Sequence, residues 1–570
     1  MGEDLCSEYD VIVIGTGMTE SIIAAAASRI GKRVLHLDRN DYYGGMWATF
    51  SFDALQRWLK ECHNQDQKNI TNFKNKTYIS QDEILISCGS QSSVSNIDEQ
   101  WFIPKNVPVN ASENSFSKNE KNDFWDQEKI KNLSRKFNLD LAPKLLFSRG
   151  SLVDLLISSN IARYAEFRSV SRILTWYNGQ LETVPCSRAD VFSTKDVSVM
   201  EKRLLMKMLQ LCAEYKPNGN EFKNFEKKTF ADYLKSKELT ENIVHYILYA
   251  IAMSSINTPC MTGVERTQKF LSSLGRFGNT PFLWPLYGSG ELPQCFCRLC
   301  AVFGGVYHLK RTADSLVVLK TDMKSICKGI VSNDQFLSTH HLILNVSEAP
   351  SSFLQETFNE GLSRGIFITN RSIYSSEKES LTLLQFPYGI KNKPITVIEI
   401  GSSTHACPDG LYIIHMTCKQ NTNATEDLKP AVEKLLEIEQ IDLDPSHSAS
   451  SGISGFAYDY EIYSGAIDMT NKENQEVKSV RPQVLWALYF NCLETSQCDL
   501  SVNVPSNIYL TSGPDADIDF EFAVKQAKEI FKKMYPNEEF LPRAPDPEEL
   551  LLDDEEIISG DNNSSLTSTE

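Results

Sequence analysis

The chain has 570 residues, of which 41% are hydrophobic and 23% are charged, and this composition is ordinary for a globular protein with a sizeable core. Its 57 Lys and Arg against 74 Asp and Glu give a net charge of −17, which argues against nucleic acid as the main partner. No apolar run reaches the roughly 18–20 residues of a membrane span, and a small disulfide scaffold is excluded at this length.

Both ends of the chain are acidic. Residues 1–10 lack a basic region, so we expect no signal peptide, a location in the cytoplasm (cytosol) and fourteen reduced cysteines. Residues 536–570 hold eleven acidic side chains and one Arg, so this segment carries most of the net charge. Its Pro-, Ser- and Asn-rich composition predicts a disordered tail.

The first 63 residues predict the start of an α/β domain, domain I. Tyr9–Ile14 is typical of a buried strand, Gly15–Gly17 of a tight turn, and Glu20–Arg29 of an alanine-rich helix. A second strand follows over Lys32–Asp38. A βαβ unit of about thirty residues with this pattern indicates a flavoprotein-like, Rossmann-type sheet.

The middle of the chain changes character twice. Residues 64–123 are polar and show no sustained period, so we expect a mobile insertion. Residues 124–255 predict a mostly α-helical domain II, in which Ser151 and Ser198 fit capping boxes because an acidic residue follows each three positions later. Asn178-Gly179 predicts a two-residue hairpin at the border of this domain.

Residues 256–535 predict the remainder of domain I, because α/β patterns return there. Strands are expected over Val306–Leu309, Pro394–Ile400 and Leu411–Cys418. Two late strands, Val484–Leu493 and Ile508–Gly513, are expected to rejoin the first sheet. The fold class predicted for the whole chain is therefore α/β, with a smaller helical domain II.

The glycine turn departs from the dinucleotide-binding fingerprint at one position. Gly15 and Gly17 match it, and Asp38 stands where a carboxylate would hold a ribose hydroxyl, but Glu20 replaces the third glycine. A bulky carboxylate there opposes an anionic pyrophosphate at the helix N-terminus. We therefore expect a vestigial site and no cofactor, with flavin binding as the alternative.

The remaining chemistry-bearing patterns are weak. Cys297 and Cys300 have the spacing of half a zinc site, but no second half lies at a usual distance, and we expect no metal. No Ser/His/Asp or Cys/His constellation, phosphate loop or HExxH motif is evident, so no catalytic residue is predicted. Tyr43, before Gly44-Gly45, is either a surface aromatic on a glycine-rich turn or a contact for a protein partner.

Four segments together are very similar to the Rab escort protein and Rab GDP-dissociation inhibitor superfamily. They are Tyr9–Gly17 with Glu20, Asp38–Gly45, Asp140–Lys144 and Pro285–Gln294. Only the polar insertion and the acidic tail fall outside the resemblance. Glu20 belongs to the family pattern, so the resemblance implies a flavin-oxidase-like fold without the flavin.

Two features favour an escort protein over an inhibitor. The chain carries the insertion at 64–123 and an extended tail, and Pro185–Phe192 followed by Glu201-Lys-Arg203 resembles the escort form of domain II. In escort proteins the residues matching Phe192 and Arg203 dock on the α subunit of Rab geranylgeranyltransferase. The resemblance thus implies a non-catalytic accessory subunit, component A of that transferase.

The resemblance also implies the partners. The Rab-binding platform would include Tyr43, Glu291, Arg298, Val306 and His308, and it would prefer the GDP-bound GTPase. The chain would present the Rab cysteines to the transferase α/β heterodimer and deliver the product to a membrane, which it contacts transiently.

A lipid carrier needs an apolar groove, because a twenty-carbon geranylgeranyl chain contributes on the order of 10 kcal/mol of membrane affinity. The leucine-rich middle region either supplies that groove or is simply its own core. The candidates are Leu145, Leu146, Leu152, Leu155, Leu156, Leu205, Met208 and Leu209.

Two other functions remain alternatives. One is a Rab GDP-dissociation inhibitor that recycles Rabs from membranes and never meets the transferase. The other is an FAD-dependent oxidoreductase of the amine-oxidase type, which would absorb near 450 nm.

Overall fold

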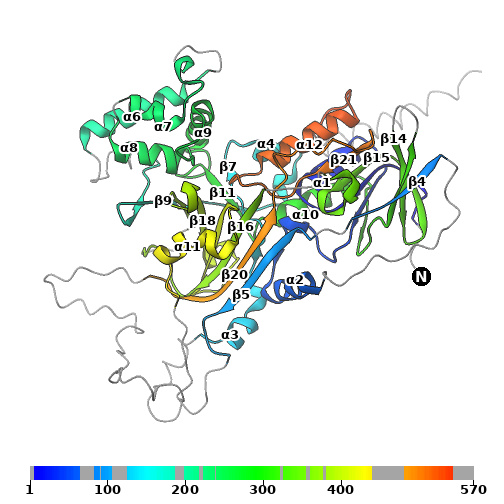
Figure 1. The fold of residues 1–570 in the computed structure, drawn as a ribbon, viewed down its shortest axis with the longest axis horizontal. Coiled ribbons are helices and arrows are strands. Elements are labelled where there is room, and N and C mark those ends of the chain that lie inside the picture. Colours follow the sequence, from blue (N-terminus) through cyan, green and yellow to red (C-terminus); the bar gives the residue numbers. More distant parts are fainter. Residues whose placement is uncertain are drawn as a thin grey trace, which may run out of the picture.

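Two eight-stranded β-sheets, a three-stranded sheet, a two-stranded sheet and the helices around them make up the described part of the chain (Figure 1). The computed structural model describes residues 5–64, 82–89, 92–105, 125–186, 198–216, 222–237, 239–320, 325–354, 360–376, 381–438 and 481–543. Within these ranges, no helix is long and apolar enough to cross a membrane.

The first sheet begins with the predicted βαβ unit. Strand β1 (Glu8–Ile14) pairs in parallel with β2 (Val34–Asp38), and α1 (Met18–Arg29) connects them. Helix α1 packs against α10 (Glu291–Val302) and α12 (Glu521–Met534). Its four alanines, residues 24–27, are fully buried, and their small side chains let these helices approach closely. The predicted Rossmann-type fold is confirmed here.

Further strands extend this sheet on both sides of β1. On one side, β12 (Val306–Leu309) pairs in parallel with β2. On the other, β15 (Gln335–Asn345) pairs with β1, β14 (Ser325–Ser332) and the late strand β21 (Ile508–Thr511). Strands β13 (Ser315–Lys320) and β4 (Glu83–Ser87) complete the sheet. The prediction that Ile508–Gly513 rejoins the first sheet is therefore confirmed.

The expectation of a mobile insertion over 64–123 is wrong for two segments. Residues 83–87 form β4, and residues 94–101 form β5 (Val94–Trp101), which pairs with β20 (Val484–Leu493) of the second sheet. Both strands have exposed faces, so they show no apolar run in the sequence. Residues 65–81, 90–91 and 106–124 lie outside the described part.

The second sheet is mostly antiparallel. Its order is β10 (Gln180–Thr183), β9 (Arg172–Tyr177), β17 (Thr382–Phe386), β18 (Ile395–Ile400), β19 (Tyr412–Lys419), β16 (Gly361–Thr369), β20 and β5. Helix α11 (Ala424–Leu435) packs on β16, β19 and β20. The prediction that Val484–Leu493 rejoins the first sheet is wrong. Nine of the ten β20 residues are buried. The sequence of a strand that is buried on both faces does not indicate which of two sheets the strand joins.

The predicted hairpin is present. Asn178 and Gly179 have φ of 48° and 85°, which gives the left-handed backbone of a type I′ turn between β9 and β10. Strand β9 then pairs in parallel with β17, so the hairpin forms one end of the second sheet.

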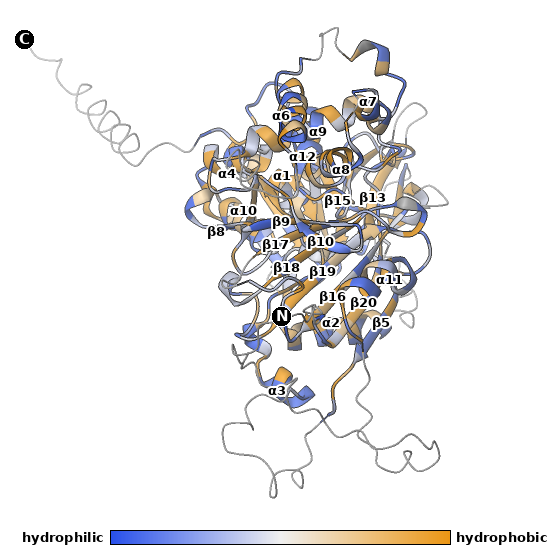
Figure 2. Cartoon of the chain, turned by 90° about the vertical axis from the view of Figure 1, so that its left-hand side faces the viewer, coloured by the Kyte–Doolittle hydropathy of each residue, from blue (hydrophilic) through white to orange (hydrophobic). Residues whose placement is uncertain are grey.

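The helical group lies at one end of the molecule (Figures 1 and 2). It contains α6 (Val199–Ala213), α7 (Phe230–Ser236), α8 (Glu241–His245), the π-helical segment η8 (Tyr246–Ile251) and α9 (Cys260–Ser273). Helix α9 packs on α6 and α7, so the group continues to Ser273, past the boundary expected at residue 255. A Cβ at Gly263 would lie 2.3 Å from the Phe230 ring, and this close approach requires glycine.

The two predicted capping boxes differ. Ser198 and Glu201 form one at the start of α6, as predicted. For α4 (Ser151–Ser158) the N-cap is Gly150, and the Ser151 N–H donates to the Glu521 carboxylate at 2.7 Å. Helix α4 packs on α12, and its start depends on a carboxylate 370 residues away.

The boundary predicted for the tail, residue 536, lies too early in the chain. The Phe540 ring lies 5.3 Å from the Phe531 ring of α12, and Leu541 is buried in the core shared with α1. Residues 544–570 lie outside the described part.

Candidate functional site

The glycine turn at the end of β1 is closed by Glu20. This side chain is fully buried, and its Oε1 accepts hydrogen bonds from the Asn345 amide and the Thr511 hydroxyl, both at 2.6 Å. A Cβ at Gly17 would lie only 2.5 Å from Glu20 Oε2, so the carboxylate fills the space beneath the turn. Burial raises the pKa of Glu20, and the two hydrogen bonds partly oppose that rise.

Asp38 is bonded entirely by nearby residues of the chain. Its Oδ2 accepts from the Thr16 N–H at 2.8 Å and from the Thr16 hydroxyl at 2.6 Å, and its Oδ1 accepts from the Asn40 N–H and amide. The Thr16 hydroxyl in turn accepts from the Gly44 N–H at 2.9 Å. The carboxylate that would hold a ribose is therefore already engaged in linking two glycine turns.

These residues do not fit a flavin dinucleotide. A cavity of about 110 Å³ lies over Gly15, Gly17 and Asp38, and it would hold only a few water molecules. The Glu20 carboxylate lies in the first turn of α1, where its negative charge opposes an anionic pyrophosphate at the helix N-terminus.

The segments that carry the family resemblance meet in space. The Asp140 carboxylate accepts from the Thr49 hydroxyl and from the Ser289 N–H, the latter at 3.0 Å. The Gly290 N–H donates to the Thr49 hydroxyl at 2.8 Å, and a Cβ at Gly288 would lie 2.7 Å from Asp140 Oδ1. Burial raises the pKa of Asp140 to about 6. The Asp140–Lys144 and Pro285–Gln294 segments thus fix the start of α10.

Helix α10 presents two of the predicted platform residues. Glu291 and Arg298 are seven positions apart and therefore lie on the same side of the helix. Glu291 is half-buried, and this raises its pKa, whereas Arg298 is exposed with its guanidinium 4.3 Å from the centre of the Tyr164 ring. The ring holds the Arg298 side chain in place by a cation–π contact.

Tyr43 adjoins the same helix through Tyr307, whose side chain interacts with Cys297 of α10. The Tyr43 ring is half-buried and meets the Tyr307 ring edge-on at 6.2 Å. The Tyr307 hydroxyl lies 3.0 Å from His36 Nδ1, and His36 Nε2 lies 2.5 Å from the Gly15 carbonyl oxygen. The carbonyl can only accept, so Nε2 carries the proton and Nδ1 accepts from Tyr307. Burial lowers the pKa of His36 to about 4, so the ring is neutral.

Val306 and His308 point to the other side of β12 from Tyr307, since side chains alternate along a strand. Val306 is exposed at the sheet edge and His308 is half-buried. The structure therefore places three predicted platform residues at α10 and the adjacent turn, and two on the opposite side of the edge strand.

Of the two predicted transferase-docking residues, the structure describes Arg203. Its side chain is exposed on α6, just beyond Glu201 of the capping box, and Phe192 lies outside the described residues. Hydrogen bonds from Ser198 and Thr240 lower the pKa of Glu201 to about 2, so the cap is charged. Val199 and Met200 are 69% and 65% exposed beside Arg203, and sequence analysis did not single them out.

The leucines considered for a lipid groove do not share one domain. Leu145, Leu205 and Met208 belong to the core that includes the helical group. Leu146, Leu152, Leu155 and Leu156 pack with α1, α10 and α12 of the first sheet, and only Leu209 is half-buried. Most of these side chains therefore belong to hydrophobic cores, which agrees with the alternative that they do not form a lipid groove.

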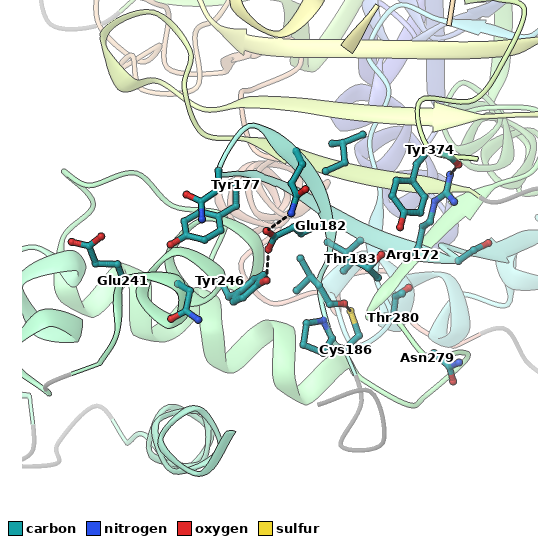
Figure 3. A pocket seen from close by; sticks show the side chains of 18 residues that line it. Arg172, Tyr177, Glu182, Thr183, Cys186, Glu241, Tyr246, Asn279, Thr280 and Tyr374 are labelled. Carbon is teal, nitrogen blue, oxygen red and sulfur yellow. Dashed lines mark hydrogen bonds between the residues drawn. The ribbon is translucent and has the colours of Figure 1, made fainter. Parts of the chain in front are cut away.

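A large cavity lies between the β9–β10 hairpin and the helices α8 and η8 (Figure 3). It measures about 930 Å³, and in Figure 3 Glu182 and Tyr246 point toward each other, with the Tyr246 hydroxyl donating to Glu182 at 2.5 Å. Most other lining side chains are polar, so this cavity is unsuited to a geranylgeranyl chain. Sequence analysis did not find it, because its walls come from segments far apart in the chain.

The three cysteines on α10, including Cys297 and Cys300, are buried. Across the described residues, no group of three His, Cys, Asp or Glu could hold a metal ion.

Comparison with known proteins identifies the family. The family model described as GDP dissociation inhibitor matches residues 5–80 and 90–481, and the model described as RAE1/2 domain I, C-terminal region, matches residues 461–516. The chain therefore belongs to the GDP dissociation inhibitor family.

Within that family the similarity is to component A of a transferase. Human "Rab proteins geranylgeranyltransferase component A 1" is 36% identical, covering 98% of this chain and 95% of the relative. Mouse "Rab proteins geranylgeranyltransferase component A 2" is also 36% identical, covering 97% of this chain and all of the relative.

Solved structures agree on the fold. The RAB GDI of Plasmodium falciparum matches with a TM-score of 0.59 at 19% identity, covering 95% of this chain and all of that one. An oxidoreductase from Methanosarcina mazei matches with a TM-score of 0.52 at 13% identity, covering 92% of this chain and all of that one. At these identities the likeness shows the fold alone.

Proposed function

We propose that this chain is a Rab escort protein, the substrate-binding component of a Rab geranylgeranyltransferase. The observation that carries the proposal is its similarity, over nearly the full length of both chains, to proteins named component A of that enzyme. Its role would be to bind newly made GDP-bound Rab GTPases, present their C-terminal cysteines to the α/β heterodimer, and deliver the prenylated product to a membrane. Its working compartment would be the cytosol.

The Rab-binding platform would centre on α10 and the turn before Gly44. Arg298, held over Tyr164, offers an exposed cation, and Tyr43, braced by Tyr307, offers an aromatic ring. Arg and Tyr are the residue types that most often dominate binding energy at protein interfaces. Glu291 would join them from the same helix, and Val306 and His308 would extend the contact to the other side of the edge strand β12.

The transferase-docking surface would lie on the first turns of α6. An Arg beside exposed apolar side chains can anchor a partner, because the chains fill a pocket while the guanidinium meets an acceptor at the rim. Arg203, Val199 and Met200 have this arrangement, and Phe192 would add an aromatic anchor.

Catalysis would belong to the heterodimer, and this chain would hold the substrate. The observation that supports this role is the filled glycine turn, since Glu20 fills the space beneath Gly17 and Thr16 engages the Asp38 carboxylate. If the chain were an oxidoreductase, the purified protein would carry a yellow chromophore with absorption near 450 nm.

The proposal is tested by reconstitution. Rab-GDP, geranylgeranyl diphosphate and the transferase heterodimer should give prenylated Rab only when this chain is added. A chain that extracts prenylated Rab-GDP from membranes but neither binds the heterodimer nor supports prenylation would instead be a recycling inhibitor, the second candidate, which the family model's description favours.

A further inference from the structure

Strand β10 forms one edge of the second sheet, and among the described strands it pairs only with β9. The Val184 N–H donates to the Ile173 carbonyl oxygen at 2.8 Å, which fixes the hydrogen-bonding register of the hairpin. In this register the N–H and C=O groups of Leu181 and Thr183 point away from β9. No described residue forms a hydrogen bond with these groups, which we call the free edge of β10.

The cavity shown in Figure 3 lies beside this free edge. Residues 180–186 line one side of its 930 Å³, and Glu241, Asn242 and Tyr246 line the other. An unpaired strand edge with open space beside it can accept a further strand, because the main-chain groups of an extended peptide complete the ladder. Pro185 has no N–H, so such a ladder ends there.

The cavity is acidic. Glu182 and Glu241 line it, and neither carboxylate forms an ion pair with a described cation. The one cationic side chain in the described lining is Arg172, which lies 3.5 Å from the buried Glu399 carboxylate and is neutralised by it. The negative charge of the cavity is therefore available to a basic ligand.

The two faces of the sheet differ at the free edge. Glu182 points toward the helices, where its carboxylate accepts from the Tyr246 hydroxyl (Figure 3). Leu181 points to the opposite face and packs with Trp176 against the core beneath α11. In a strand added here, every second side chain would lie beside Glu182, and the side chains between them would lie beside Leu181.

We propose that the free edge of β10 binds an extended segment of a partner protein by antiparallel strand addition. Leu181 and Thr183 each supply one main-chain donor and one main-chain acceptor to this segment. The segment carries Lys or Arg at alternate positions, which face Glu182 and Glu241, and apolar side chains between them. Because main-chain groups make most of the hydrogen bonds, the site accepts many sequences that share this alternation.

The probe is a fluorescein-labelled peptide of sequence Lys-Val-Lys-Val-Lys with a Gly-Ser spacer, titrated against the native full-length chain by anisotropy. The affinity should fall about fivefold between 50 and 300 mM salt, because the charged contacts are partly exposed. A matched peptide with Glu in place of every Lys should bind at least about tenfold more weakly. Equal binding of the two peptides would overturn the proposal.

Backbone N-methylation separates strand addition from simple charge attraction. When the lysines face Glu182, the N–H groups of the two valines point to β10 and those of the lysines point away. N-methylation of both valines should weaken binding at least about tenfold, whereas N-methylation of two lysines should change it less than about threefold. Equal effects of the two modifications would contradict strand addition.

Two substitutions at one position test the same contact from the protein side. Thr183→Pro removes an outward-facing N–H and leaves the ladder to β9 intact, so it should abolish peptide binding without lowering the thermal midpoint. Thr183→Ala keeps the N–H and should bind within about twofold of the native chain. Native affinity in a folded Thr183→Pro variant would overturn the proposal, and the N-methylated peptides decide the matter without altering the fold.

A charge variant tests the acidic face. Glu182→Gln with Glu241→Gln should weaken binding of the lysine peptide about tenfold and remove most of its salt dependence. The matched pair Glu426→Gln with Glu433→Gln, on α11, should leave both unchanged. An unchanged affinity in the first pair would contradict the acidic recognition face.

A second copy of the chain is the competing occupant, because two free edges can pair with each other. Light scattering at the concentrations of the titration should show a monomer. A dimer that the peptide dissociates would assign the free edge to self-association and would overturn the proposal.

Discussion

Glu20 and Thr511 are 491 positions apart in the chain, yet the hydroxyl of Thr511 donates to the Glu20 carboxylate at 2.6 Å. The bond joins the first turn of α1 to the last strand of the first sheet, and Asn345 of β15 donates to the same oxygen. A single carboxylate thus links the start of α1 to the ends of two strands, β15 and β21. In this chain the glycine turn has a structural role.

Replacing Glu20 tests that role. Glu20→Ala should lower the free energy of unfolding by about 2 kcal/mol, because the Asn345 amide and the Thr511 hydroxyl lose their buried acceptor. Glu20→Gln keeps an acceptor oxygen and should stay within about 1 kcal/mol of the native chain. Urea unfolding followed by tryptophan fluorescence measures both. Equal losses in the two variants would show that side-chain volume, and not hydrogen bonding, matters there.

His36 should make the chain acid-sensitive. Its pKa is about 4 in the folded chain and about 6.5 in an unfolded one, so below pH 6.5 the unfolded state binds more protons. Stability from this residue is complete above pH 6.5 and is lost as the pH falls toward 4, by about 2 kcal/mol at pH 5. The measurement is the urea midpoint between pH 5 and 8. His36→Gln should remove the His36 share of that dependence, whereas His340→Gln, whose side chain is 67% exposed, should have no such effect. Burial also lowers the pKa of His245 to about 4, so its share should remain.

The platform residues should matter for Rab binding. Tyr43→Ala and Arg298→Ala should each weaken binding to Rab-GDP by about 1–3 kcal/mol in a calorimetric titration, because each removes an interface anchor. Arg298 is exposed, so its loss should leave the thermal midpoint unchanged, whereas Tyr43 also contacts Tyr307 and should have a small effect. Tyr374→Ala, another exposed tyrosine, is the control. Normal binding by both platform variants would contradict the assignment.

Transferase docking should depend on α6. Arg203→Ala and Phe192→Ala should each strongly weaken capture of the transferase heterodimer and slow Rab prenylation in parallel, while binding to Rab-GDP stays normal. Lys207→Ala, an exposed change one turn along α6, should have no effect. Prenylation at the native rate with both Phe192 and Arg203 replaced would place the docking site elsewhere and would favour the recycling inhibitor.

The end of the fold can be located by truncation. Ending the chain after Arg543 should leave the thermal midpoint within about 1 °C, because the Pro-rich acidic composition of residues 544–570 is unsuited to a packed core. Ending it after Tyr535 removes Phe540 and Leu541 from the core and should cost about 2–4 kcal/mol. Differential scanning calorimetry measures both. A large loss from the first truncation would show that the acidic segment is packed into the core.

The sequence by itself determined those turns and helix starts that depend on only a few neighbouring residues. Asn178-Gly179 specifies a type I′ turn because both positions adopt the left-handed backbone. Ser198 and Glu201 specify a helix start because they bond each other across one turn. The glycine turn with Glu20 likewise predicted both the βαβ unit and its unsuitability for a dinucleotide.

Only the tertiary structure decided which elements pair and which side chains meet. Val484–Leu493 is buried on both faces, so its sequence fits either sheet, and β16 and β5 determine its place. Strands β4 and β5 are half-exposed and gain their stability from neighbours distant in the chain. Tyr43 and Tyr307 meet because β2 and β12 pair in parallel, a contact between residues 264 positions apart that no local pattern records.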